Sequence, residues 1–175
     1  MEQRQLRMIR PDLDDLPPVV LPDGCEIRAY RPGDEKVWAE IMNTGIGSDW
    51  DAARAKEHLT RQPRFDPEGL FFAALDGKTV GSACAWRSSA EERKTGMVHM
   101  LCVLPEARGR KIGYALTLRA LHYFRDHGFS DAYLDTDDVR IPAIKAYLRL
   151  GFEPFYYDET HMERWERVRS EINAG

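Results

Sequence analysis

Residues 101–115 constrain this chain more than any other stretch. They read Leu-Cys-Val-Leu-Pro-Glu-Ala-Arg-Gly-Arg-Lys-Ile-Gly-Tyr-Ala, an apolar strand followed by a basic turn and the start of a helix. The first N–H groups of a helix lack intrahelical acceptors, and the helix dipole places partial positive charge there. Three cations and two glycines at this turn would let an anion approach the backbone closely. The turn is therefore predicted to bind phosphate, and pyrophosphate in particular.

Length and composition limit the class of protein. A chain of 175 residues with 43% hydrophobic residues suffices for one well-buried domain. The formal charge of −4 argues against nucleic acid as the main partner and accommodates a cationic substrate more easily. No apolar run reaches the length of a membrane span, and the first twenty residues lack the apolar core of a signal peptide, so no membrane partner and a cytoplasmic location are expected. The three cysteines show no C-x-x-C spacing, which predicts buried thiols and no metal site.

The first third of the chain is predicted to contain little regular structure before two helices. Residues 1–24 carry several prolines and are expected to form an extended arm. A short strand is expected over 26–30, followed by helices over 34–43 and 52–61. The glycine-containing loop between the helices ends in Trp50, so it would either close over a substrate or cover the edge of the core.

The middle of the chain predicts an antiparallel meander that leads into a crossover. Apolar runs over 70–75 and 79–87 flank Asp76-Gly77, a strong hairpin signal, and a charged turn over 91–94 precedes a strand over 96–104. A helix that ends near Gly128 then separates this strand from another over 132–136, so the two strands should be parallel neighbours. A helix over 139–150, a strand over 152–156 and a tail helix over 161–172 complete the pattern.

Two motifs at this separation resemble the GNAT superfamily of acyl-CoA-dependent N-acyltransferases. They are Leu-x-Val-x-Pro-x-x-Arg-Gly-x-x-Ile-Gly-x-Ala at 101–115 and Ala-Ile-x-x-Tyr-x-x-Leu-Gly-Phe at 143–152. The resemblance covers a domain from 25 to 156, with 157–175 as a helical tail packed on it. It implies an α+β fold with a mixed, twisted sheet flanked by helices on both faces. The arm, the 135–138 Asp-Thr-Asp-Asp run and Arg164-Trp165 are more faintly similar to GNAT proteins of the mycothiol synthase branch.

The resemblance implies acetyl-CoA as the co-substrate. Its diphosphate would lie on the basic turn, and its pantetheine arm would lie like an extra strand between the strands at 96–104 and 132–136. Family members usually have glycine where Lys111 stands and asparagine where Arg140 stands, so these two positions depart from the pattern. The residues implied to bind the coenzyme are Leu101, Cys102, Val103, Arg108, Gly109, Arg110, Lys111, Ile112, Gly113, Tyr114 and Arg140.

Acetyl transfer to an amine needs a group that removes a proton and a group that supplies one. Tyr147 occupies the family's position for the acid that protonates the departing thiolate. His99 is a candidate for a base that acts through water, since an unperturbed imidazole has a pKa near 6.5. Alternation along the strand places His99 on one face with Leu101 and Val103, so it could equally be a core or edge histidine.

The expected activity is acetyl transfer from acetyl-CoA to a primary amine of a small molecule in a ternary complex. Glu26, Trp50 and Asp135 are candidates for binding the cationic acceptor, with helix capping as the other role for the carboxylates. A peptide or protein acceptor, and a non-catalytic coenzyme A-binding module, are the alternatives. Dimers are common in the family, and the tail helix offers a surface for a homodimer.

Overall fold

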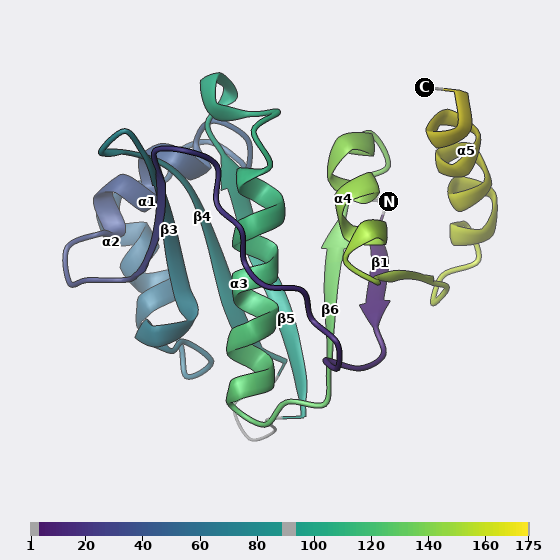
Figure 1. Ribbon diagram of the computed structural model, residues 1–175, viewed down its shortest axis with the longest axis horizontal. Coiled ribbons are helices and arrows are strands. Elements are labelled where there is room, and N and C mark those ends of the chain that lie inside the picture. The colour runs from purple at the N-terminus through teal and green to yellow at the C-terminus, as the bar shows by residue number, and fades with distance from the viewer. Residues whose placement is uncertain (1–3, 89–93, 175) are drawn as a thin grey trace.

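The computed structural model describes residues 4–88 and 94–174, which form a single mixed sheet with helices on both faces (Figure 1). The charged turn expected at 91–94 lies outside the described residues, except for Lys94. The strands in the described residues are β1 (Leu6–Arg10), β2 (Cys25–Ala29), β3 (Leu70–Leu75), β4 (Lys78–Arg87), β5 (Thr95–Val103), β6 (Asp131–Thr136) and β7 (Glu153–Phe155). The helices are α1 (Glu35–Met42), α2 (Ala52–Ala55), which the π-helical turn η1 (Lys56–Thr60) continues, α3 (Ile112–Asp126), α4 (Ile141–Arg149) and α5 (His161–Ala174), with short 3-10 turns at η2 (Pro67–Gly69) and η3 (Pro105–Ala107).

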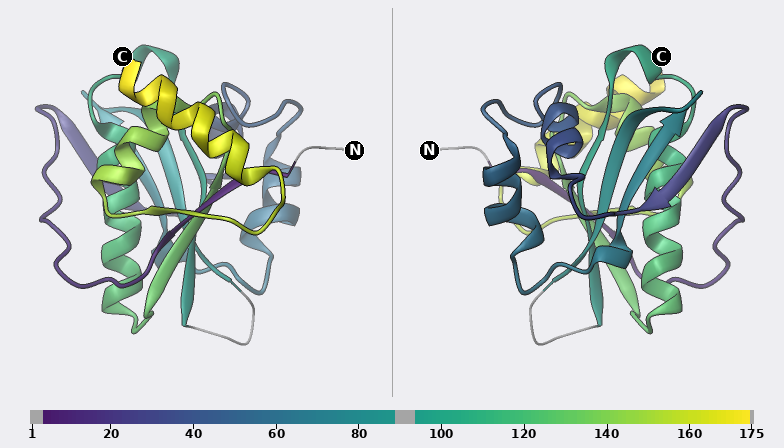
Figure 2. Two further views of the ribbon diagram at one scale, coloured as in Figure 1. Left: turned by 90° about the vertical axis from the view of Figure 1, so that its right-hand side faces the viewer. Right: turned by 90° about the vertical axis from the view of Figure 1, so that its left-hand side faces the viewer.

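The sheet confirms the predicted α+β architecture. Its strand order is β2-β3-β4-β5-β6-β1-β7, with an antiparallel meander from β2 to β5 and a parallel β5–β6 pair that α3 connects. Figure 2 shows the layers edge-on, with α1 and α2 on one face and α3 and α4 on the other. The apolar stripe of α3 packs on β4 and β5, where Gly96 makes room for the ring of Phe124.

The N-terminal residues correct one prediction. The expectation that this region lacks regular structure is wrong for Leu6–Arg10, because β1 is inserted into the sheet between β6 and β7 and pairs antiparallel with both. Leu6 and Met8 are fully buried and alternate with the partly exposed Arg7 and Ile9, and the first proline, Pro11, comes only after the strand has ended. Beyond Pro11 the chain has no helix or strand up to β2, and it crosses the outer side of α3 (Figure 2).

The parallel pair of β5 and β6 diverges soon after it begins. The two strands pair only from Thr95 to Met97, so the rest of β5 leaves β6 on that edge. On the other edge, β5 pairs with β4 through a bulge, in which Met100 adopts a positive φ of 52°. The bulge inserts an extra residue and reverses the alternation of side chains that follow it.

The bulge therefore overturns the predicted face of His99. His99 stacks on Trp86, which belongs to the core under α1 and α2. Leu101 and Val103 instead pack in the core under α3. A strict period of two would have placed these three β5 residues on one face.

Helix α5 forms where the tail helix was predicted and is held by buried side chains. Trp165 is 1% exposed, and Arg164 pairs with Asp138 and donates a hydrogen bond to the carbonyl of Arg4. These contacts join the two ends of the described chain to the region between β6 and α4.

Candidate active site

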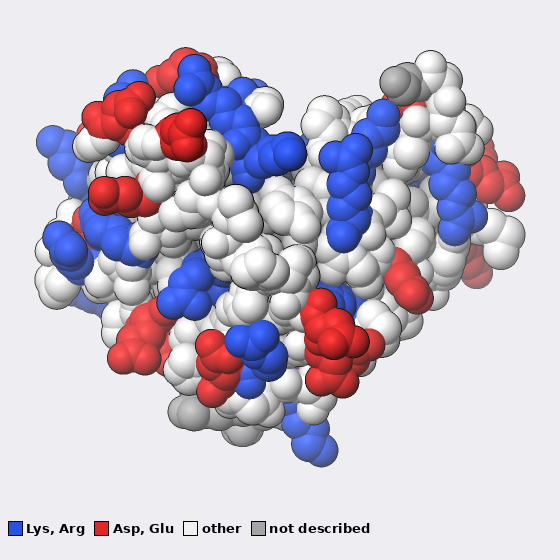
Figure 3. Space-filling view, in the orientation of Figure 1, with Lys and Arg blue, Asp and Glu red and all other residues white. Residues whose placement is uncertain are grey.

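A cavity of about 1380 Å³ runs from the N-terminal turn of α3 to the divergence of β5 and β6. Figure 3 shows the surface hollowed between α3 and α4, with Lys and Arg side chains on both sides of the hollow. All eleven residues implied to bind the coenzyme line this cavity: Leu101, Cys102, Val103, Arg108, Gly109, Arg110, Lys111, Ile112, Gly113, Tyr114 and Arg140. Tyr147 lines it as well. The structure thus brings together residues from β5, the basic turn, α3 and α4.

The basic turn has the backbone geometry of an anion site. Gly109 has a φ of 78°, and Lys111 caps α3 with a φ of 62° and a ψ of 13°. A left-handed conformation costs a residue other than glycine about 1–2 kcal/mol, which explains why glycine is usual at this position. Lys111 adopts the glycine conformation nonetheless, and the first residues of α3, Ile112 and Gly113, line the cavity. The first N–H groups of a helix lack intrahelical acceptors and suit an anion. Arg108 donates from Nε to the carbonyl of Val103 at 3.0 Å, which ties the turn to the end of β5.

Arg140 links two walls of the cavity. Its guanidinium lies 2.9 Å from Asp137 and donates a hydrogen bond to the carbonyl of Gly45 at 3.4 Å. The start of α4 is thereby joined to the loop that follows α1. On the floor of the cavity, the buried thiol of Cys102 donates to the carbonyl of Ile41 at 3.4 Å, which ties β5 to the end of α1. The Cys102 thiol therefore has a structural partner.

Tyr147 lines the cavity and is 8% exposed. Burial raises the pKa of its phenol to about 12, while the charge of Arg140 opposes the shift. The ring packs edge-on against Phe152, with centroids 6.0 Å apart. The phenol is therefore protonated at neutral pH and can donate a proton inside the cavity.

His99 lies apart from this cavity. Its ring is 5.1 Å from that of Trp86, on the face of the sheet that α1 and α2 cover. Burial and, to a smaller extent, the nearby charge of Arg64 lower the pKa of His99 to about 4, while the charge of Asp135 opposes the shift. The imidazole is therefore neutral at neutral pH and can accept a hydrogen bond, but it is a weak base.

The three candidates for acceptor binding lie in different places. Glu26 is exposed on the edge strand β2, and β3 and β4 separate it from β5. Trp50 donates from its indole nitrogen to the carbonyl of Ile46 at 2.8 Å and packs edge-on against Trp38. It thereby holds the loop whose residue Ile46 lines the cavity, without lining the cavity itself. Asp135 is engaged in a bidentate ion pair, described next.

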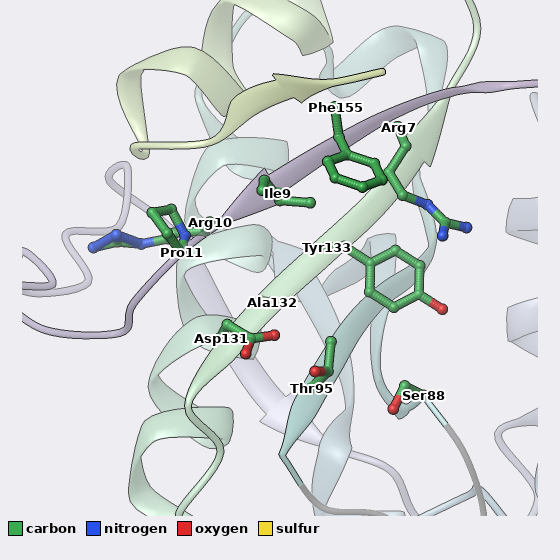
Figure 4. A pocket seen from close by; sticks show the side chains of 10 residues that line it. All are labelled: Arg7, Ile9, Arg10, Pro11, Ser88, Thr95, Asp131, Ala132, Tyr133 and Phe155. Atoms are coloured by element: carbon green, nitrogen blue, oxygen red, sulfur yellow. The ribbon is translucent and has the colours of Figure 1, made fainter. Parts of the chain in front are cut away.

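Sequence reasoning missed a second pocket of about 500 Å³ on the other face of the sheet, where β5, β6, β1 and β7 meet (Figure 4). Arg7 from β1 lines it and holds Asp135 through two hydrogen bonds of 2.8 and 2.9 Å. The guanidinium of Arg7 also lies 4.3 Å from the ring centre of Tyr133 and 5.0 Å from that of Tyr157. The alternation of Leu6 and Met8 around Arg7 was the signal that could have revealed this strand.

Comparisons with known proteins agree with the fold and the motifs. Residues 37–152 match the model of the acetyltransferase (GNAT) family. A mycothiol acetyltransferase from Thermomonospora curvata is 36% identical over 159 residues, which cover 87% of this chain and 52% of the relative. A mycothiol acetyltransferase from Streptomyces bingchenggensis is 33% identical, with coverage of 89% and 53%. The chain spans about half the length of these relatives.

Solved structures show the same fold. A GCN5-related N-acetyltransferase from Sphaerobacter thermophilus superposes with a TM-score of 0.70 at 25% identity, over 87% of this chain and 50% of that one. Ard1 from Thermoplasma volcanium superposes with a TM-score of 0.63 at 22% identity, over 79% of this chain and 91% of that one. In the described residues, no helix is long and apolar enough to cross a membrane, and no cluster of side chains suited to a metal ion is found. The resemblance drawn from the two motifs is confirmed, and the chain belongs to the acetyltransferase (GNAT) family.

Proposed function

We propose that this protein transfers an acetyl group from acetyl-CoA to a primary amine of a small-molecule acceptor, by direct attack in a ternary complex. The observation that carries the proposal is that one cavity is lined by the N-terminal turn of α3, by the stretch of β5 that no longer pairs with β6, and by Tyr147. The anion site would hold the diphosphate at one end, and a protonated phenol would lie near the thioester at the other. Membership of the acetyltransferase family supports the same reaction class.

The divergence of β5 from β6 supplies the binding site for the pantetheine arm. Beyond Met97, β5 does not pair with β6, so backbone groups of residues 101–103 on that edge can pair with an extended ligand. Pantetheine carries amide groups suited to this edge. A backbone N–H that points at the thioester carbonyl would stabilise the negative charge that develops on its oxygen during attack.

Tyr147 is the proposed acid. As the amine nitrogen bonds to the carbonyl carbon and the carbon–sulfur bond breaks, the sulfur leaves as a thiolate and Tyr147 Oη donates its proton to it. An acceptor that arrives as an ammonium must lose one proton to water before its nitrogen can attack, and the nitrogen loses a second proton as the amide forms. That second proton returns through water to the phenolate of Tyr147, which restores the acid. His99 stays a candidate base, although its lowered pKa makes it a poor one at neutral pH.

The acceptor is proposed to approach from the face of the sheet that carries the second pocket. Thr95 lines that pocket, and Met97 and His99 continue along the same face of β5 towards the opening. Because Arg7 compensates the charge of Asp135, recognition there would depend on the tyrosine rings and polar groups more than on a free carboxylate. Amines related to mycothiol are the first acceptors to test, because the two relatives described above are mycothiol acetyltransferases.

An acetyl-CoA-dependent thiol-release assay over a panel of amines tests the proposal. The panel contains mycothiol-related amines, polyamines, amino acids, aminoglycosides and short peptides. Turnover with a small amine is the expected result, and turnover with peptides alone would favour the protein-acceptor alternative. Tight coenzyme A binding without turnover of any amine would favour the non-catalytic module. Failure to bind coenzyme A would reject that module and the proposed acetyltransferase alike.

A further inference from the structure

The segment from Pro17 to Pro22, called the proline arm below, forms a wall of the coenzyme cavity. Five of its six residues line the cavity: Pro17, Pro18, Val20, Leu21 and Pro22. Figure 2 shows this part of the chain outside α3, away from the sheet. The proline arm lies outside residues 37–152, so the family match does not account for it.

The proline arm is anchored on the core and on α3. The side chains of Leu16, Val19 and Leu21 pack against the core under α3. His122 of α3 donates from Nε2 to the carbonyl of Pro17 at 2.7 Å. Prolines restrict the backbone before folding, so holding this segment in one path costs less conformational entropy than it would for other residues. A wall built in this way is pre-organised for a ligand.

One residue of the arm is left facing outward. Val20 is 76% exposed, although it lines the cavity and its neighbours Val19 and Leu21 pack inward. An exposed apolar side chain at the rim of a cavity offers contact area to a ligand that fills the cavity. Val20 and the flanking prolines are therefore available to an apolar, planar group such as a purine ring.

The position of the anion site indicates which half of the ligand meets the arm. The basic turn and Tyr147 both line the cavity, and Tyr147 is only 8% exposed, whereas Val20 is 76% exposed. A diphosphate at the turn, with its thioester near Tyr147, leaves the exposed rim for the nucleotide. We propose that the proline arm is part of the binding site for the nucleotide half of coenzyme A. This inference rests on the proposed function.

Charge substitutions at Val20 test the inference. A glutamate at this rim would repel the phosphates of the nucleotide, and a lysine would attract them. We expect Val20→Glu to raise, and Val20→Lys to lower, the dissociation constant of coenzyme A by roughly three- to tenfold at low salt. The same opposite shifts are expected with adenosine 3′,5′-bisphosphate, which carries the nucleotide half alone. Both variants should keep the wild-type melting temperature, because the side chain is exposed.

Matched variants at Met162 provide the control. Met162 is 66% exposed on α5 and lines neither pocket, so Met162→Glu and Met162→Lys should leave both dissociation constants unchanged. Equal dissociation constants for the two Val20 variants would overturn the inference, as would shifts seen with coenzyme A but not with the bisphosphate. If the wild-type protein binds no coenzyme A, the proposed function itself fails. Binding that is insensitive to Val20 rejects only the role of the arm.

Discussion

The half-buried imidazole of His99 makes the stability of this protein sensitive to acid. Burial against Trp86 and the charge of Arg64 lower its pKa in the folded protein from 6.5 to about 4. In the unfolded chain the imidazole titrates near 6.5. Between pH 6.5 and pH 4 the unfolded state therefore binds more protons than the folded state. The free energy of unfolding must fall as the pH falls through that window.

The size of the effect follows from the two pKa values. With values of about 4 folded and 6.5 unfolded, protonation of the unfolded state lowers the free energy of unfolding by about 0.2 kcal/mol at pH 7 and by up to about 2 kcal/mol at pH 5. Below pH 4 the loss levels off at about 3 kcal/mol, because both states are then protonated. A domain of this size is typically stable by about 5–15 kcal/mol, so the loss is easily measured.

Urea denaturation of the wild type and of His99→Gln at pH 7 and pH 5 isolates this group. Other titrating side chains are common to the two proteins and cancel in the comparison. Between pH 7 and pH 5 the wild type should lose up to about 2 kcal/mol more stability than the glutamine variant. An NMR titration of the imidazole gives the folded pKa directly. Parallel losses in the two proteins, or a folded pKa near 6.5, would refute this account of His99.

Three further substitutions test the site and the core. Tyr147→Phe should lower kcat by about 100-fold or more, which is the usual contribution of a general acid. The affinity for coenzyme A should stay near that of the wild type. An unchanged kcat would show that Tyr147 is not the acid. Lys111→Gly should be more stable than Lys111→Ala by roughly 0.5–1 kcal/mol, because both lose the charge and only glycine relieves the left-handed backbone; equal melting temperatures would contradict this. Gly96→Ala should destabilise by about 1–3 kcal/mol, because its new methyl group would lie 2.5 Å from the ring of Phe124. Gly113→Ala is the control, since its nearest contact would be 3.7 Å away, and similar melting curves for the two alanine variants would disprove the close packing.

Much of the fold was predictable because its signals are local. The Asp76-Gly77 hairpin, the apolar stripe of α3 and the length of the crossover each depend on residues close together in the chain. They predict the meander, the helix and the parallel β5–β6 pair that the structure contains. The basic motif at 101–115 is equally compact. Its residues line a single cavity because they follow one another from the end of β5 into α3.

The errors occurred where a distant partner decides the outcome. The prolines of the N-terminal region obscured β1, whose place between β6 and β7 depends on strands more than 120 residues away. Arg7 from that same strand pairs with Asp135, a contact that no pattern near Asp135 in the chain predicts. Strict alternation predicted that His99 and Leu101 lie on one face of the sheet. The bulge at Met100 places them on opposite faces.

The sequence alone thus predicted most of the elements, the basic turn before α3 and the likeness of the two motifs to a family, because helix starts, hairpins and side-chain periodicity arise from neighbours in the chain. Tertiary structure alone decided where β1 is inserted, which charges are compensated, how β5 is bulged and what the proline arm covers. Those features depend on which strands pair and which surfaces meet. Residues far apart in the chain carry no local pattern that encodes such contacts.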